Sequence, residues 1–160
     1  MVTVSWLKNK LDNHENGVII NNADLDSFHS IHDFLEILEH PSKTFAIYYQ
    51  AFSGESSEEF LATLKEELTS KLAMPQLSSA NSLSEIVIAT KLRMIILDQS
   101  DLCSLDTLNE LLYEFAKSDI RLILAGSYHK LKTARILSHP TIKQWEQFTV
   151  GDPTAILSAR

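Results

Sequence analysis

Cysteine is almost absent from this sequence, with Cys103 the single one among 160 residues, so no internal disulfide can form. A chain without disulfides suits a reducing compartment. Long apolar runs are missing too, since no stretch approaches the roughly 18 residues that a membrane span requires. The first residues also lack the basic segment followed by an apolar one that marks a secretory signal. We therefore expect a cytoplasmic protein that does not span a membrane.

Positive charge is scarce in the first half of the chain. Residues 1–90 carry 5 Lys/Arg against 13 Asp/Glu, a net charge of −8, whereas residues 91–160 carry 9 against 8, a net charge of +1. The acidic balance argues against direct nucleic-acid binding, which needs clustered positive charge. Lys130, Lys132 and Arg135 can still form a basic strip on one predicted helix, although a solvated helix face is the commoner meaning of such a strip. We expect a protein partner or self-association.

Glycine and proline are few, with four of each, while hydrophobic residues make up 44% of the chain and charged residues 22%. This balance and length fit one globular domain with a sizeable core. We divide it into an N-terminal helix over 1–16, an α/β core over 17–150 and a C-terminal tail over 151–160. Hydrophobic periodicity and turn signals predict helices over 3–14, 25–39, 56–72, 84–92, 105–117 and 128–137. The predicted strands cover 18–20, 45–52, 94–98, 121–125 and 148–150.

Three of these strands, over 18–20, 94–98 and 121–125, are continuous apolar runs instead of alternating ones. Strands of that kind are buried on both faces, which is typical of a parallel sheet covered by helices. Because helices alternate with the strands along the chain, the sequence predicts a three-layer α/β sandwich with a five-stranded parallel sheet.

The segment after the first strand has the length and place of the phosphate-binding loop of a P-loop NTPase, but not its chemistry. That loop reads GxxxxGK[ST], because glycines let backbone N–H groups wrap the phosphates and lysine bridges phosphate oxygens. Here Phe28 takes the lysine position and His29 the hydroxyl position, while Asp24 and Asp26 would repel a triphosphate by a few kcal/mol at ~4 Å. The whole degenerate loop is Asn22, Ala23, Asp24, Leu25, Asp26, Ser27, Phe28 and His29.

The stretch RMIILDQSDL, residues 93–102, carries the second half of the nucleotide-site pattern. A buried strand ends in Asp98, where a P-loop NTPase holds Mg²⁺. Gln99 follows, where a glutamate normally activates the attacking water, and an amide cannot take the proton from that water. Ser127, after Gly126, occupies the place of a residue that senses the γ-phosphate, although a serine there is more often a plain helix N-cap.

Residues 95–127, IILDQSDLCSLDTLNELLYEFAKSDIRLILAGS, resemble the Walker B to sensor-1 segment of the TniB/TnsC-type AAA+ ATPases of transposition. The "HP.I..W" segment at His139–Trp145 and the strand after it continue the resemblance. It covers residues 17–150 as architecture and 93–150 as sequence. The resemblance implies an AAA+ core with strand order 5-1-4-3-2. The family's helical lid domain has no counterpart in the predicted elements, and the losses at the phosphate loop and at Gln99 argue against ATP hydrolysis.

Two other clusters carry a possible chemistry. His29, His32 and His40 share a predicted helix with Asp33 and Glu36, and a His-x-x-His pair can bind Zn²⁺ when a third ligand converges. No third ligand is signalled, so a solvated face is the better interpretation and no metal is predicted. Cys103 lies in a predicted loop without a recognisable partner base, and we assign it no nucleophilic role.

Three hypotheses for the function remain open at this point. The first is a pseudo-ATPase, a P-loop-like module without catalysis that acts through protein contacts, in a mobile element or another DNA transaction by resemblance alone. The second is a nucleotide-binding protein or weak NTPase with an unconventional phosphate loop, which would use ATP and Mg²⁺. The third is an unrelated α/β binding or signalling domain. We favour the first, without an enzymatic activity or a cofactor.

Overall fold

A five-stranded parallel sheet forms the centre of the protein. The computed structural model describes residues 2–21, 31–32, 34–36, 45–72 and 82–150. The strands are β1 (Gly17–Asn21), β2 (Ala46–Gln50), β3 (Met94–Asp98), β4 (Arg121–Ser127) and β5 (Glu146–Val150). Every pairing is parallel and the order is β2-β3-β4-β1-β5, which reads 5-1-4-3-2 from the other edge. The predicted α/β fold with a five-stranded parallel sheet is therefore confirmed.

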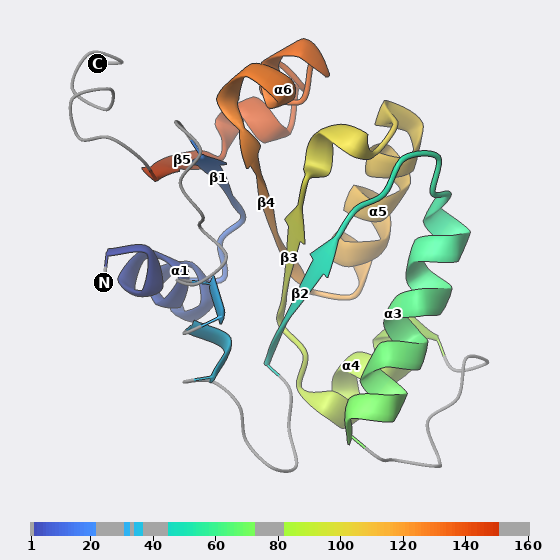
Figure 1. Ribbon diagram of the computed structural model, residues 1–160. Helices are drawn as coiled ribbons and strands as arrows, with labels where there is room; N and C mark the ends of the chain where they lie inside the picture. Colours follow the sequence, from blue (N-terminus) through green and yellow to red (C-terminus); the bar gives the residue numbers. More distant parts are fainter. Residues whose placement is uncertain (1, 22–30, 33, 37–44, 73–81, 151–160) are drawn as a thin grey trace.

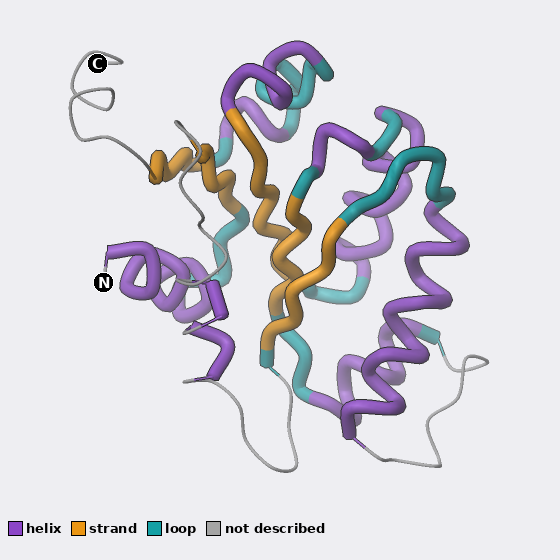
Figure 2. Tube along the Cα trace, viewed as in Figure 1, coloured by secondary structure: helices purple, strands orange, loops and turns teal. Residues whose placement is uncertain are grey.

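Helices cover both faces of this sheet, as Figures 1 and 2 show. One face carries α1 (Val2–Asp12) and the helical residues 31–32 and 34–36. The other carries α3 (Ser57–Leu72), α4 (Leu83–Thr90) and α5 (Leu105–Lys117). The short α6 (Tyr128–Thr133) follows β4, and two 3₁₀ turns span Ser100–Leu102 and Ile142–Gln144. None of the described helices is long and apolar enough to cross a membrane.

Alternate residues of β1, β2, β3 and β4 enter two separate cores, because successive side chains of a strand point to opposite faces. In β3, Ile95 and Leu97 pack in the core beneath α3, α4 and α5. Met94 and Ile96 pack in the other core, together with Leu7 of α1. All four strand residues are fully buried. The continuous apolar run of β3 thus has the cause that the sequence indicated, burial on both faces.

A serine N-cap begins both α4 and α5, although α4 begins at Leu83, one residue before the predicted start. The Ser82 side chain accepts a hydrogen bond from the Glu85 amide while the Glu85 carboxylate accepts one from the Ser82 amide, a complete capping box. Ser104 begins α5 by accepting from the amide of Thr107 at 3.1 Å. Such caps satisfy amides that the first turn of a helix leaves without partners.

The predicted helix over 128–137 is too long, since α6 ends at Thr133. Arg135 adopts the left-handed conformation with φ +64°. The Ile136 amide bonds back to the Leu131 carbonyl and the Arg135 amide to the Lys132 carbonyl, both at 3.0 Å. This is a Schellman ending, here without the usual glycine. Fully buried Ile136 explains it, because ending the helix lets this side chain join the core.

The N-terminal helix is fastened to the edge strand β5 by polar and aromatic contacts. Trp6 stacks on Phe148 with ring centroids 5.3 Å apart and donates through Nε1 to the Glu146 carboxylate at 2.5 Å. Lys10 is only 2% exposed and pairs with Glu146 at 3.1 Å and with Glu15 at 3.4 Å. A buried ammonium needs such partners, because an unpaired buried charge is strongly destabilising.

Candidate functional site

The carboxyl ends of the strands bring the described members of the predicted nucleotide site to one edge of the sheet. Asn21 ends β1 in register with Ser127 of β4, and Asp98 ends the neighbouring β3. Open parallel sheets bind ligands at this edge, where the crossover connections change direction. The predicted phosphate loop, Asn22 to His29, lies outside the described residues.

Asp98 is held by the protein through both carboxylate oxygens. The Tyr48 hydroxyl from β2 donates to its Oδ2. The backbone amide of Gln99 donates to its Oδ1 at 2.8 Å. Hydrogen bonds to an ionised acceptor are among the strong ones, worth about 1.5–3 kcal/mol each. A metal ion at Asp98 would therefore compete with bonds that the side chain already makes.

Gln99 is exposed and takes the left-handed backbone conformation, with φ +52° and ψ +43°. That conformation costs roughly 1–2 kcal/mol for a residue with a Cβ atom. It turns the chain sharply away from the sheet into the 3₁₀ turn that follows. The position expected to activate a water thus carries an amide on a strained turn, which has no base to offer.

Ser100 is fully buried directly after this turn and connects β3 to β4. Its Oγ donates to the Leu97 carbonyl at 2.6 Å and accepts from the Ala125 amide at 3.3 Å. The hydroxyl extends the β3–β4 pairing beyond Leu97, the last β3 residue in register with β4. Sequence reasoning missed this role, and a serine after Asp-Gln carries no local signal for it.

Ser127 and Asn21 lie at the same edge of the sheet but differ in their hydrogen bonding. The Ser127 side chain accepts from the Lys130 amide at 3.4 Å and caps α6, so it acts as the plain N-cap that the sequence favoured. Asn21 has its Oδ1 atom buried without a hydrogen-bond partner among the described residues. A buried polar oxygen without a partner costs free energy, commonly about 1–3 kcal/mol. Among the described residues, Asn21 therefore has a buried oxygen left to accept a hydrogen bond from a ligand or water.

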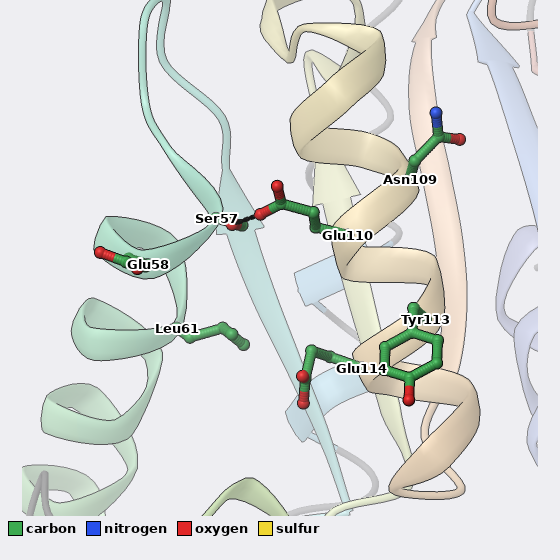
Figure 3. Close-up of a pocket in the computed structure, with 7 residues that line it drawn as sticks. All are labelled: Ser57, Glu58, Leu61, Asn109, Glu110, Tyr113 and Glu114. Atoms are coloured by element: carbon green, nitrogen blue, oxygen red, sulfur yellow. Dashed lines mark hydrogen bonds between the residues drawn. The ribbon is translucent and has the colours of Figure 1, made fainter.

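A groove between α3 and α5 forms a second candidate site, with a volume of about 480 Å³. Figure 3 shows Ser57 and Glu110 pointing toward each other across it, joined by a hydrogen bond from the serine hydroxyl. Tyr113 is 67% exposed at its rim. The full lining is Ser57, Glu58, Leu61, Asn109, Glu110, Tyr113 and Glu114. Three carboxylates over an apolar Leu61 suit a cationic group with an alkyl stem. Nothing in the sequence pattern indicated this groove, because helices α3 and α5 lie far apart along the chain.

The structure does not support a metal site at the described histidine or a nucleophilic role for Cys103. His32 pairs with Glu36 at 3.1 Å on an exposed face, while His29, Asp33 and His40 lie outside the described residues. Within the described ranges, no three His, Cys, Asp or Glu side chains gather to hold a metal ion. Cys103 is buried, and this burial raises the pKa of its thiol to about 11, so the nucleophilic thiolate is suppressed.

The predicted basic strip on one helix does not form, because Arg135 lies beyond the end of α6. Lys130, Lys132 and Arg135 are all exposed, and the Lys132 ammonium lies 5.9 Å from the centre of the Tyr128 ring. Lys130 and Lys132 are two residues apart in a helix, so they point to different sides of it. The three cations do not form a single stripe.

Comparisons with known proteins add no family to this geometry. A scan against protein-family models and a search of curated proteins both return no match.

Proposed function

We propose that this chain is a P-loop-like domain without catalytic activity, a pseudo-ATPase that acts through protein contacts. The observation that carries the proposal is the state of Asp98, whose two carboxylate oxygens each accept a hydrogen bond, one from the Tyr48 hydroxyl and one from the Gln99 amide. Strand order 5-1-4-3-2 supports the P-loop-like class. A setting in a mobile element or another DNA transaction rests on the sequence resemblance alone.

Catalysis would need groups that the described edge does not offer. A phosphoryl-transfer site works by positioning a metal ion, the phosphates and a water. Here Asp98 is already bonded, Gln99 is an amide and Ser127 caps α6. The positions that the resemblance would assign to metal and γ-phosphate thus serve the protein's own structure, and the position that it would assign to water activation lacks a base.

Thermal unfolding with and without millimolar ATP and Mg²⁺ tests this proposal. A pseudo-ATPase with this edge should show no shift in its melting temperature, and no phosphate release. A protein that bound ATP would gain about 2.7 kcal/mol at a ligand concentration 100 times its Kd. An Asp98→Asn variant serves as control. A shift in the wild type that disappears in this variant would refute the proposal, because it would place a bound metal at Asp98.

A nucleotide-binding role is the second candidate, and one observation favours it. The Oδ1 of Asn21, which has no hydrogen-bond partner in the described part of the chain, lies at the same edge of the sheet and is able to accept a hydrogen bond from a ligand. In that case the thermal shift with nucleotide would persist in Asp98→Asn and disappear in Asn21→Ala. The two variants therefore separate a bound nucleotide without metal from the nucleotide–metal complex.

Protein contact is supported by the groove between α3 and α5. Its carboxylates and the exposed Tyr113 suit a partner segment that carries lysine or arginine. Selection from a library of displayed random peptides should enrich basic sequences on the wild type. A double variant, Glu110→Lys with Glu114→Lys, should lose this enrichment. Equal enrichment on both proteins would show that the groove does not contact the peptides.

A further inference from the structure

The turn between β2 and α3 places a carboxyl group inside the protein. Glu55 is only 5% exposed, and its Oε2 accepts a hydrogen bond from the Tyr49 hydroxyl at 2.7 Å. Its backbone carbonyl accepts from the Thr107 hydroxyl of α5 at 3.2 Å. Glu55 therefore connects β2 to α5 with its side chain and its backbone, across 52 residues of sequence.

The second carboxyl oxygen of Glu55 is buried without a hydrogen-bond partner among the described residues. An ionised carboxylate in this place would be strongly destabilised, since a buried charge needs a counter-ion or several donors. Among the described residues, no ion pair joins a cationic side chain to Glu55, and no metal-binding cluster occurs in that part of the chain. Within the described part of the chain, a proton is the remaining way to neutralise the group.

None of the titratable neighbours of Glu55 carries a positive charge. Tyr49 from β2, Glu59 from α3 and Cys103 from the segment before α5 are the groups that interact with it electrostatically. Each becomes negative on losing a proton, so none can balance an ionised Glu55. Burial raises the pKa of Glu55 above its ordinary 4.5, and Glu59 adds to the rise, whereas the hydrogen bond from Tyr49 opposes it.

We propose that Glu55 is a proton-dependent link, which holds the turn over 51–56 against α5 while its carboxyl is neutral and releases the turn when that carboxyl ionises. An ionised Glu55 gains hydration by leaving its site, and the Thr107 bond is lost with it. Ser57, two residues further along, bonds to Glu110 across the groove, so release also alters one wall of that groove. The link goes beyond the proposed function and does not depend on it.

The test compares the pH dependence of stability in the wild type with that in Glu55→Gln, whose amide mimics the neutral acid. A group with a raised folded pKa contributes stability that is complete below its unfolded pKa and is lost as the pH rises through its folded pKa. Above pH 4.5 the folding equilibrium constant of the wild type should fall relative to the variant, by up to about tenfold per pH unit. Glu58→Gln, an exposed neighbour, is the matched control and should follow the wild type.

Urea unfolding between pH 4 and 9, at steps of about half a unit, gives the three profiles. Parallel profiles for the wild type and Glu55→Gln would overturn the proposal. A carbon NMR titration of the Glu55 side-chain carboxyl in the wild type provides an answer even when Glu55→Gln fails to fold. A midpoint above 4.5, accompanied by faster amide exchange over 55–60 than in the rest of α3, supports the link. A midpoint at or below 4.5 would refute it.

Discussion

Replacing Ser100 by alanine should destabilise the protein more than any other single loss of a hydroxyl group at the strand ends. The fully buried Oγ donates to the Leu97 carbonyl at 2.6 Å and accepts from the Ala125 amide at 3.3 Å, and alanine can do neither. Two buried backbone groups lose a partner, each worth about 1–3 kcal/mol. Removing the hydroxyl also removes its own cost of burial, so we expect a net loss of about 2–3 kcal/mol. For a chain of this length that corresponds to a fall of about 4–12 °C in melting temperature.

Urea unfolding measures this loss, and the midpoint should fall without a change in the slope m, because the folded state keeps its buried surface. Ser84→Ala is the control. Its hydroxyl makes a single part-buried bond to the Ser118 hydroxyl at 3.2 Å, so a loss of about 0.5–1 kcal/mol is expected. The reasoning would be refuted if Ser100→Ala cost no more than Ser84→Ala. That result would mean that the 3₁₀ turn after β3 is not tied to β4 through this hydroxyl.

Three further predictions concern the sheet edges. Gly17→Ala should cost about 1–3 kcal/mol in calorimetry, because the new Cβ would lie 2.6 Å from the Trp6 ring, which is held by Glu146; an unchanged melting temperature would show that Trp6 moves freely. Tyr48→Phe should lower stability by about 1–2 kcal/mol through the lost bond to Asp98 without creating ATP hydrolysis, and a phosphate-release assay that became positive would contradict the proposed function. The hydrogen bond from Trp6 lowers the pKa of Glu146, so the wild type should be more stable than Glu146→Gln above pH 4.5. This difference in stability should disappear as the pH falls through the pKa that Glu146 has in the folded protein. A difference that persisted at lower pH would contradict the lowered pKa of Glu146.

Elements that depend on local sequence were predicted with accurate bounds. The strand over 94–98 and the helix over 105–117 coincide with β3 and α5. Their signals are the apolar run before Asp98 and the apolar period that follows Ser104, and both act within a few residues. The helix over 128–137 was wrong at its end, since the left-handed turn at Arg135 serves the burial of Ile136 in the core. That cause lies in tertiary packing, which a periodicity over ten residues does not contain.

In the candidate site, too, the positions of the residues could be predicted from the sequence, whereas some of their hydrogen-bond partners could not. The positions of Asp98, Gln99 and Ser127 at the carboxyl edge follow from strand ends, which the sequence marks by itself. The hydrogen bond from Tyr48 to Asp98 was decided by tertiary structure, because Tyr48 lies 50 residues from Asp98. The sequence around Glu55 is typical of an exposed loop. In the structure Glu55 is buried, because it contacts Tyr49 and α5.

The sequence by itself therefore determined the elements, their type and the parallel class of the sheet, because hydrophobic period and capping operate over one or two turns of chain. Tertiary structure decided which carboxyl groups are buried and which accept a bond from a distant strand, because those partners meet only after the sheet has formed. Asp98 is the clearest case. Its place at the end of β3 follows from the four apolar residues before it, whereas the hydrogen bond that it accepts from Tyr48 depends on the neighbouring strand β2.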